Sequence, residues 1–200
     1  MNQFIHIIKE GKKRIEFSQE GKYVVFFHNV SAQFEFEIMA PKVELYIYGL
    51  YTGRSKSKYE LSTIQHHTAP NSFSHLFVKG VFDEASSFIY DGLIKIDPFA
   101  HGSHAYQKNQ NIILSPDVFV SSKPNLEILA NDVYCTHGST TGKMNGDAIF
   151  LLQSKGIPRD LAKRVFITGF LNEIFDNMIA HVPNTGAVKS LREQVVKKYD

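Results

Sequence analysis

The stretch FEFEI, residues 34–38, is followed after a proline-containing turn by KVELYIYGLY, residues 42–51. In the first stretch, Phe34, Phe36 and Ile38 share one face of an extended chain, because successive side chains of a strand point to opposite faces. The two glutamates fall on the other face. The second stretch continues this alternation of apolar and other residues. The pattern therefore predicts two consecutive β-strands, each with an apolar face.

Similar patterns recur along residues 1–146. Runs rich in β-branched and aromatic residues alternate with turn signals, one of which is predicted at Lys123-Pro124-Asn125. The further strands predicted are residues 60–66, 74–82, 87–96, 103–114, 118–121, 126–130 and 133–136. Short strands spaced about ten residues apart fit a sandwich, a barrel or a β-solenoid, and the spacing alone does not separate these folds.

The pattern changes to a helical one after Gly146. Residues 148–156 predict one or two helical turns, and Pro158 predicts the first turn of a longer helix that ends before Pro183. Apolar residues recur along this helix at steps of three and four: Leu161, Val165, Phe166, Phe170, Ile174, Met178 and Ile179. A last short helix carries Val188, Leu191, Val195 and Tyr199 on one face. Both stripes are interpreted as core packing, with a docking surface as the alternative for part of the longer one.

These patterns divide the chain into a β body over residues 1–146 and a helical segment over residues 147–200. The total of 200 residues, of which 43% are hydrophobic, suits one domain or one domain with a small appendage. The net charge of +2 gives no electrostatic reason to expect nucleic acid or an anionic membrane as a partner. No apolar run approaches the roughly 18 residues that a membrane span needs. A lone cysteine fits a reducing compartment, so we expect a cytoplasmic protein.

The only cysteine of the chain lies in NDVYCTHGSTTG, residues 131–142. On a strand, Cys135 and His137 would point to the same face with their Cβ atoms about 7 Å apart. A thiolate and an imidazole are suitable ligands for zinc, copper or an iron–sulfur centre. The pair is only half of a closed metal site. Distant residues or a partner chain would supply the other ligands, or the thiol is a buried packing group that binds nothing.

Other candidate clusters carry weaker signals. His66 and His67 are adjacent, so they point to opposite faces of a strand, and we expect one to be internal and the other exposed. A cupin-like metal barrel would use His66, His67 or His75 with a carboxylate, but the two-histidine spacing expected on one of its strands is absent. A carbohydrate-acting β-helix would need a cluster of acids, for which Asp83, Asp91, Asp97 and Asp132 are candidates. The sequence contains no nucleophile elbow, phosphate-binding loop, dinucleotide fingerprint or zinc-protease motif.

Four longer motifs, in consecutive order, resemble the SufB/SufD family of iron–sulfur cluster assembly scaffolds. HHTAPNSFSHLFVKGVFDEASSFIYDG (66–92) resembles the family's H-x-x-P-x-[ST]-x-S-x-x-x-x-K-G segment, and AYQKNQNIILS (105–115) resembles its Q-x-N-x-x-L-L-S strand. KPNLEILANDVYCTHGSTTG (123–142) is similar to the SufD type of its cysteine–histidine motif. AIFLLQSKGIPRDLAKRVFITGFLNEIF (148–175) resembles its F-Y-L-x-S-R-G-I segment and the amphipathic helix that follows.

The resemblance implies a mainly β protein, a right-handed parallel β-helix with a short C-terminal helical segment. It implies a SufD-like scaffold without enzymatic activity of its own, working with a SufC-type ATPase and with a SufB-type chain or a second copy of itself. His137 and Cys135 match the family residues linked to iron or cluster assembly. The cargo would be a transient iron–sulfur cluster or iron shared with the partner. The ATPase would dock on the helical stripe at Leu161, Val165, Phe166, Phe170 and Ile174.

The sequence departs from the family pattern at a few positions. Thr136 and Ser139 replace a serine and an alanine of the cysteine–histidine motif, and Leu151 and Lys155 replace a tyrosine and an arginine of the next one. Family members are longer and carry an N-terminal helical domain, whereas this sequence begins inside the expected β-helix. The resemblance therefore implies either a minimal scaffold that pairs with itself or a fold that has lost the assembly role.

Overall fold

The computed structural model describes residues 2–182 and 184–196, and in them two parallel sheets share the strands alternately along the chain. Sheet A contains, in spatial order, β1 (Asn2–Ile7), β3 (Gly21–His28), β5 (Val43–Gly53), β7 (Phe73–Phe82), β9 (Ser103–Ile113) and β11 (Val133–Lys143). Sheet B contains β10 (Phe119–Ile128), β8 (Ser87–Ile96), β6 (Lys58–His67), β4 (Ala32–Ile38) and β2 (Gly11–Phe17). Each strand pairs in parallel with the strand two places further along the chain, as β5 does with β7 and β6 with β8.

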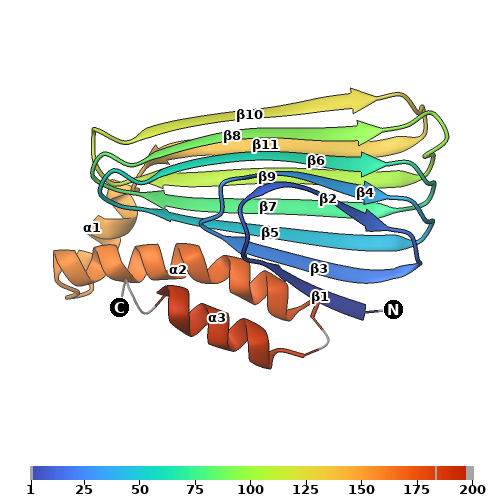
Figure 1. Cartoon of the computed structure of the whole chain (residues 1–200). Coiled ribbons are helices and arrows are strands. Elements are labelled where there is room, and N and C mark those ends of the chain that lie inside the picture. The colour runs from blue at the N-terminus through green and yellow to red at the C-terminus, as the bar shows by residue number, and fades with distance from the viewer. Residues whose placement is uncertain (1, 183, 197–200) are drawn as a thin grey trace.

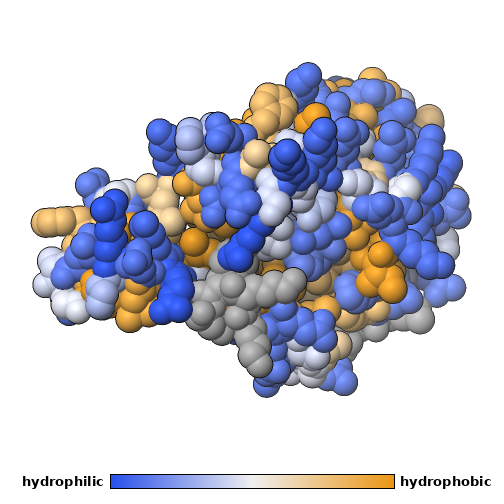
Figure 2. Space-filling view, turned by 60° about the vertical axis from the view of Figure 1, so that its left-hand side comes forward, coloured by the Kyte–Doolittle hydropathy of each residue, from blue (hydrophilic) through white to orange (hydrophobic). Residues whose placement is uncertain are grey.

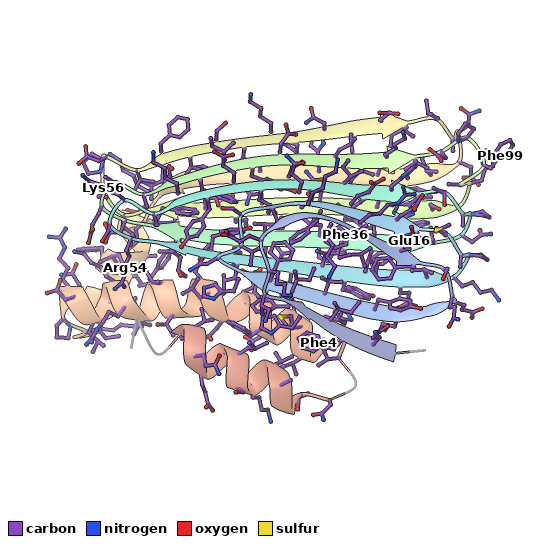
Figure 3. The ribbon with its side chains drawn as sticks, viewed as in Figure 1. Phe4, Glu16, Phe36, Arg54, Lys56 and Phe99 are labelled. Atoms are coloured by element: carbon purple, nitrogen blue, oxygen red, sulfur yellow. The ribbon has the colours of Figure 1, made fainter. Side chains whose placement is uncertain are left out.

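This arrangement is a parallel β-helix, in which each turn of the chain contributes one strand to each sheet (Figure 1). It confirms the mainly β fold with C-terminal helices that the resemblance implied. Apolar side chains from both sheets fill the lumen between them, including Phe34 and Phe36 of the alternating stretch at residues 34–38. Phe36 lies between the two sheets in Figure 3. The alternation therefore predicted correctly which face of that strand is buried.

Three helices follow the last strand: α1 (Gly146–Ser154), α2 (Arg159–Ile179) and α3 (Gly186–Val196). The Asn145 side chain caps α1 by accepting hydrogen bonds from the backbone N–H groups of Asp147 and Ala148. The helices α2 and α3 lie along the outer face of sheet A, beneath β1, β3 and β5 in Figure 1. The earlier strands of sheet A are consequently covered on both faces, and residues 24–27 of β3 are all buried.

Lys79 of β7 links the middle of sheet A to α2 through a hydrogen bond and an ion pair. Its side chain is fully buried, and its ammonium group donates to the Phe170 carbonyl oxygen at 2.8 Å and forms an ion pair with Glu173. The ammonium group also lies 3.9 Å from the centre of the Phe170 ring. Burial lowers the pKa of Lys79, and the Glu173 carboxylate opposes this shift. Because a buried charge is costly without a partner, this contact fixes the position of α2 along the sheet.

The structure differs from the sequence predictions at several elements. Residues 118–121 and 126–130 were predicted as two strands with a turn at Pro124, but Phe119–Ile128 form one strand, β10, which runs through Pro124. Pro124 is tolerated because β10 is the edge strand of sheet B, where every second N–H has no ladder partner to lose. β11 extends to Lys143, well beyond the predicted residues 133–136. Strands β1, β2 and β3 were not individually predicted, and Pro183 and Tyr199 lie outside the described residues.

The chain changes from strands to helices between Lys143 and Gly146, close to the boundary predicted between residues 146 and 147. That the two parts are separate domains stays a prediction, and α2 and α3 share a hydrophobic cluster with the outer face of sheet A. Among the described helices, none is both long enough and apolar enough to cross a membrane.

Near the later strands, the lumen also contains a buried histidine. His67 has no exposed surface, and its two ring nitrogens each lie 2.7 Å from a serine hydroxyl, Nδ1 from Ser72 and Nε2 from Ser74. Burial, with a smaller contribution from His66, lowers the pKa of His67 to about 3. The histidine is therefore a neutral hydrogen-bonding group of the core, as expected for one member of the His66–His67 pair.

We predict that the free energy of unfolding decreases as the pH is lowered from 7 to 5. Unfolded His67 takes up a proton near its ordinary pKa of 6.5, whereas the folded form does not until about pH 3, so acid favours the unfolded chain. At pH 5 this residue alone accounts for about 2 kcal/mol. Urea unfolding at several pH values would measure the slope. His67→Gln should flatten it, and an unchanged slope in that variant would contradict the assignment to His67.

Candidate functional site

The candidate cysteine–histidine pair lies on the last rung of the solenoid, formed by β10 and β11. These two strands are the edges of sheets B and A, so each has a neighbour on one side only within the described residues. The pairing of β11 with β9 sets Cys135 beside Ala105 and His137 beside Gln107, both of which are buried in the lumen. Cys135 and His137 therefore belong to the lumen-facing row of β11, as their spacing predicted.

Cys135 is half-buried at the rim of a small apolar cluster. The cluster contains Ile94, Ile96, Ala100, Ala105 and Ala130, with Cys135, Ile128 and Val133 packed against it. Burial raises the pKa of the thiol, and a hydrogen bond with the Ala105 backbone opposes the increase. In the single chain, the thiol is consequently protonated near neutral pH and would release its proton on binding a metal.

His137 is exposed at the open end of the lumen. A surface depression of about 540 Å³ lies beside it, mainly on the outer face of sheet A, where it is lined by outward-facing residues such as His75, Tyr106 and Lys108. Because its side chain is exposed, the imidazole of His137 is accessible to an incoming ligand. Two residues away on the same row, the Ser139 hydroxyl donates to the Ser122 hydroxyl of β10 at 2.8 Å and links the two edge strands.

Within the part of the chain that the structure describes, no three or more His, Cys, Asp or Glu side chains are grouped so that they could hold a metal ion. In the lumen-facing rows of β10 and β11, Cys135 and His137 are the side chains suited to bind iron. Cluster and iron sites in proteins usually have four protein ligands or nearly so. A site built on this pair would need donors from outside the chain.

The other predicted clusters do not form sites. His66 lies on the outer face of sheet B, 3.1 Å from a carboxylate oxygen of Asp97, whereas His67 lies in the lumen and His75 on the outer face of sheet A. The histidines therefore do not meet inside a barrel, as a cupin-like site would require. Asp83 follows β7 and Asp97 follows β8, and these strands end at opposite ends of the solenoid (Figure 1). The acids do not converge as a carbohydrate-acting site would need.

Most of the predicted docking stripe on α2 faces the chain's own sheet. Ile174 is fully buried against the outer face of sheet A, and Phe166 and Phe170 are partly buried in the same cluster. These three residues hold α2 in place, so Ile174 in particular cannot contact a partner while the helix is docked. The two remaining residues of the stripe are open, since Leu161 is 41% exposed and Val165 46% exposed.

Two further apolar side chains, for which the sequence predicted no docking role, are exposed on the neighbouring helix α1. Phe150 is 71% exposed and Leu151 57% exposed. Together with Leu161 and Val165 they form what we call the hairpin patch, carried by α1 and the first turns of α2. The face of the molecule seen in Figure 2 is mostly hydrophilic, broken by smaller groups of hydrophobic side chains. Four large exposed apolar residues on one helical hairpin are thus a candidate interaction surface.

Comparison with known proteins gives a consistent family match. Residues 12–170 match the family model described as "SUF system FeS cluster assembly, SufBD core domain". The matched region runs from β2 into α2 and includes the terminal rung.

Several related proteins carry names of the same family. An iron–sulfur cluster assembly SufBD family protein of Mycobacterium leprae is 29% identical over 175 residues, which cover 84% of this chain and 42% of the relative. A SufBD family protein of Synechocystis is 29% identical over 139 residues, covering 70% of this chain and 30% of the relative. The Escherichia coli iron–sulfur cluster assembly protein SufD is 32% identical over 96 residues, covering 48% and 23%. The chain therefore spans less than half the length of these relatives.

Proposed function

Because the chain belongs to the SufBD family of iron–sulfur cluster assembly proteins, we propose that it is a SufD-like scaffold subunit, not itself an enzyme. The family match supports a role in iron–sulfur cluster assembly. We propose in addition that the chain is of the SufD type and that it has the partners named below. A cytoplasmic location belongs to the same proposal, because a cluster-handling thiol must stay reduced.

The observation that carries the proposal is the open terminal rung. Cys135 and His137 belong to the lumen-facing row of β11, at an end of the solenoid where neither sheet has a further strand among the described residues. A second solenoid that placed its own edge strands against β10 and β11 would continue both sheets. It would also bring its side chains to the two ligands of this chain. The partner in the proposal is a SufB-type chain or a second copy of this one.

The chemistry of the pair suits a cargo that is assembled and passed on. Thiolate is a soft ligand favoured by iron–sulfur centres, and imidazole is a more exchangeable one. Cys135 would lose its proton when iron binds, since only the thiolate is a good ligand. With the missing ligands supplied across the interface, iron or a cluster would be held between two chains and released when they separate.

The hairpin patch is the proposed docking site for a SufC-type ATPase, which would supply the ATP hydrolysis. Of the five docking residues predicted from the sequence, the proposal keeps Leu161 and Val165, which are exposed. It adds Phe150 and Leu151 of α1. Near the patch, Lys143, Arg159 and Lys163 line a depression of about 530 Å³ between the solenoid and the hairpin. A partner surface with apolar residues bordered by carboxylates would complement both features.

We predict that the double variant Leu161→Asp/Val165→Asp fails to bind the ATPase while keeping its fold. Both side chains are exposed, so carboxylates there cost little in the free chain, but they would have to be desolvated in the interface. The affinity should fall by at least about tenfold. Phe99→Asp is the matched control, because Phe99 is 81% exposed at the opposite end of the solenoid (Figure 3). Equal binding by the double variant and the control would contradict this docking site.

The proposed function is tested by co-expressing the chain with the SufC-type ATPase and the SufB-type chain of the same genome. A stable complex on size exclusion, followed by cluster formation on anaerobic addition of iron and sulfide, would support the scaffold role. A chain that binds neither protein and forms no cluster as a self-dimer would show that the family fold is kept without the assembly role.

A further inference from the structure

The lumen changes character along the solenoid. In the early rungs it is filled by apolar residues such as Val25, Phe27 and Leu45. Towards the terminal rung, the lumen-facing residues become polar although they remain buried: Gln65, His67, Ser72, Ser74, Ser103, Gln107, Asn109 and Asn111. Burying polar groups is costly unless they are hydrogen-bonded, so each needs a partner.

Most of these polar groups have one within the chain. The Gln65 amide donates to the Ser74 hydroxyl at 2.7 Å. The Asn111 amide donates to Asn109 Oδ1 at 2.6 Å and to Thr141 Oγ1 at 3.1 Å, so it connects the last buried rung to β11. Gln65 Oε1 has no partner within the described part of the chain, although the amide of that side chain is bonded. Gln107, which is 2% exposed, has no hydrogen-bond partner for either Oε1 or Nε2 among the described residues.

The position of the Gln107 carboxamide is set by Gly92 on the facing strand β8. A Cβ atom at residue 92 would lie 2.2 Å from Gln107 Nε2 and 2.4 Å from the Tyr90 hydroxyl oxygen. Gln107 therefore reaches across the lumen and uses the space that a glycine leaves open. The side chain is held in place sterically while its polar atoms remain free for a hydrogen bond.

The neighbours of this carboxamide on the two sides along the solenoid differ in whether they can form a hydrogen bond with it. On the side of the earlier rungs, Gln107 is paired with Leu76, and Gly92 with Thr63, whose hydroxyl is already bonded to Tyr90. On the side of the terminal rung, Gln107 is paired with His137 and Gly92 with Pro124. Side chains in register on neighbouring parallel strands stack about 4.8 Å apart, and amides in such ladders bond to the next side chain. Among these register neighbours, His137 is the one with an uncommitted polar side chain.

We propose that Gln107 is a positioning residue for His137, whose imidazole it holds by a hydrogen bond when a second solenoid covers the terminal rung. This inference rests on the proposed function, in which His137 is an iron ligand. One ring nitrogen binds the metal and the other is fixed by the Gln107 carboxamide, which sets the ring orientation. Partners that fix a ligand histidine in this way usually contribute about 10- to 100-fold to metal affinity.

The test uses the assembled complex, with its partner solenoid in place, and anaerobic Co(II) as a spectroscopic probe for iron. In Gln107→Leu, the Co(II) affinity should fall by about tenfold and the visible spectrum should shift. The melting temperature should stay equal or rise, because an unpaired buried amide has been replaced by an apolar group. Gln107→Glu keeps the shape and an acceptor oxygen, so it should restore the wild-type spectrum.

Gln110→Leu is the matched control, since Gln110 lies on the same strand but on its outer face. If Gln107→Leu binds Co(II) with wild-type affinity and spectrum while His137→Ala does not, the positioning role is wrong and the proposed site stands. If His137→Ala binds Co(II) as the wild type does, the proposed site is wrong and the role of Gln107 falls with it. A loss of affinity in Gln110→Leu equal to that in Gln107→Leu would also overturn the inference.

Discussion

Replacing His137 by alanine should reduce cluster formation on the assembled complex to less than about a tenth of the wild-type yield, with no loss of fold. The imidazole is exposed on an edge strand at the open end of the lumen, so its removal leaves no cavity in the core. What is lost is one of the two ligands that we propose for the cluster on the terminal rung. Anaerobic reconstitution followed by visible absorption would measure the yield, and thermal unfolding would measure the fold.

Cys135→Ser is the companion variant, and we expect a smaller loss. Cys135 is half-buried against an apolar cluster and its thiol has a raised pKa, so part of its role is packing. Serine keeps the size of the side chain but is a poorer ligand for iron. Complete loss in both variants would contradict this ranking. Unfolding of His137→Ala would instead indicate that the histidine supports the structure.

Most strands after residue 33 were predictable from the sequence, but their arrangement was not. The alternation at residues 34–38 identified a strand and its buried face correctly. Alternation describes one strand and its two environments, whereas a sandwich, a barrel and a solenoid differ in which strands pair. That pairing depends on contacts between residues about 30 positions apart, as between Ile47 and Leu76. The choice of the β-helix therefore came from the family resemblance and not from periodicity.

Strand β3 shows why alternation can also miss an element. Its central residues, 24–27, are all apolar and all buried, because the lumen lies on one face and α2 and α3 cover the other. A strand buried on both faces gives a continuous apolar run, which periodicity alone cannot distinguish from a buried helix. At Pro124 the error was a turn predicted where a strand continues. Proline usually indicates a turn, but β10 is an edge strand and tolerates it.

The apolar stripe of α2 was predicted from the sequence. That one part of it packs on sheet A while another part stays exposed was not predicted. Ile174 and Leu161 belong to the same stripe, yet the first is buried on sheet A and the second is exposed. An amphipathic pattern indicates that one face of a helix will be covered, but it does not indicate whether the chain itself or a partner covers that face. The length of α2 decides it here, because the helix begins beyond the end of the sheet and only its later turns reach the covered face (Figure 1).

For the candidate site, the relative orientation of the two neighbouring residues was predictable from the sequence. The spacing of Cys135 and His137 placed both on one face, and the structure assigns that face to the lumen. Their position at the open end of the solenoid follows from where the strands stop, which no motif records. Gln107 could not be identified, because its unmatched amide becomes evident only when Gly92 and Leu76 are placed around it.

The second large effect is expected at the edge of the solenoid, where Thr141→Glu should abolish pairing through the terminal rung. Thr141 is exposed in the single chain and belongs to the lumen-facing row of β11. A glutamate there could still accept the hydrogen bond from Asn111, so the single chain should remain folded. Covering the rung with a second solenoid would desolvate the new carboxylate without a cation to pair with it. We expect the dissociation constant of the paired solenoids to rise by at least about 100-fold, measured by sedimentation.

Thr140→Glu provides the matched control, because it introduces the same charge one residue away on the outer face of β11. If the partner continues both sheets, the lumen-facing row is enclosed and the outer face stays in water, so only Thr141→Glu should dissociate the pair. If both variants weaken the pair equally, the partner contacts the edge of β11 without closing the lumen. In that case Cys135 and His137 would stay open to solvent in the complex, and a cluster held between two chains would need another explanation. The difference between two adjacent threonines thus tests the geometry on which the proposed cluster site depends.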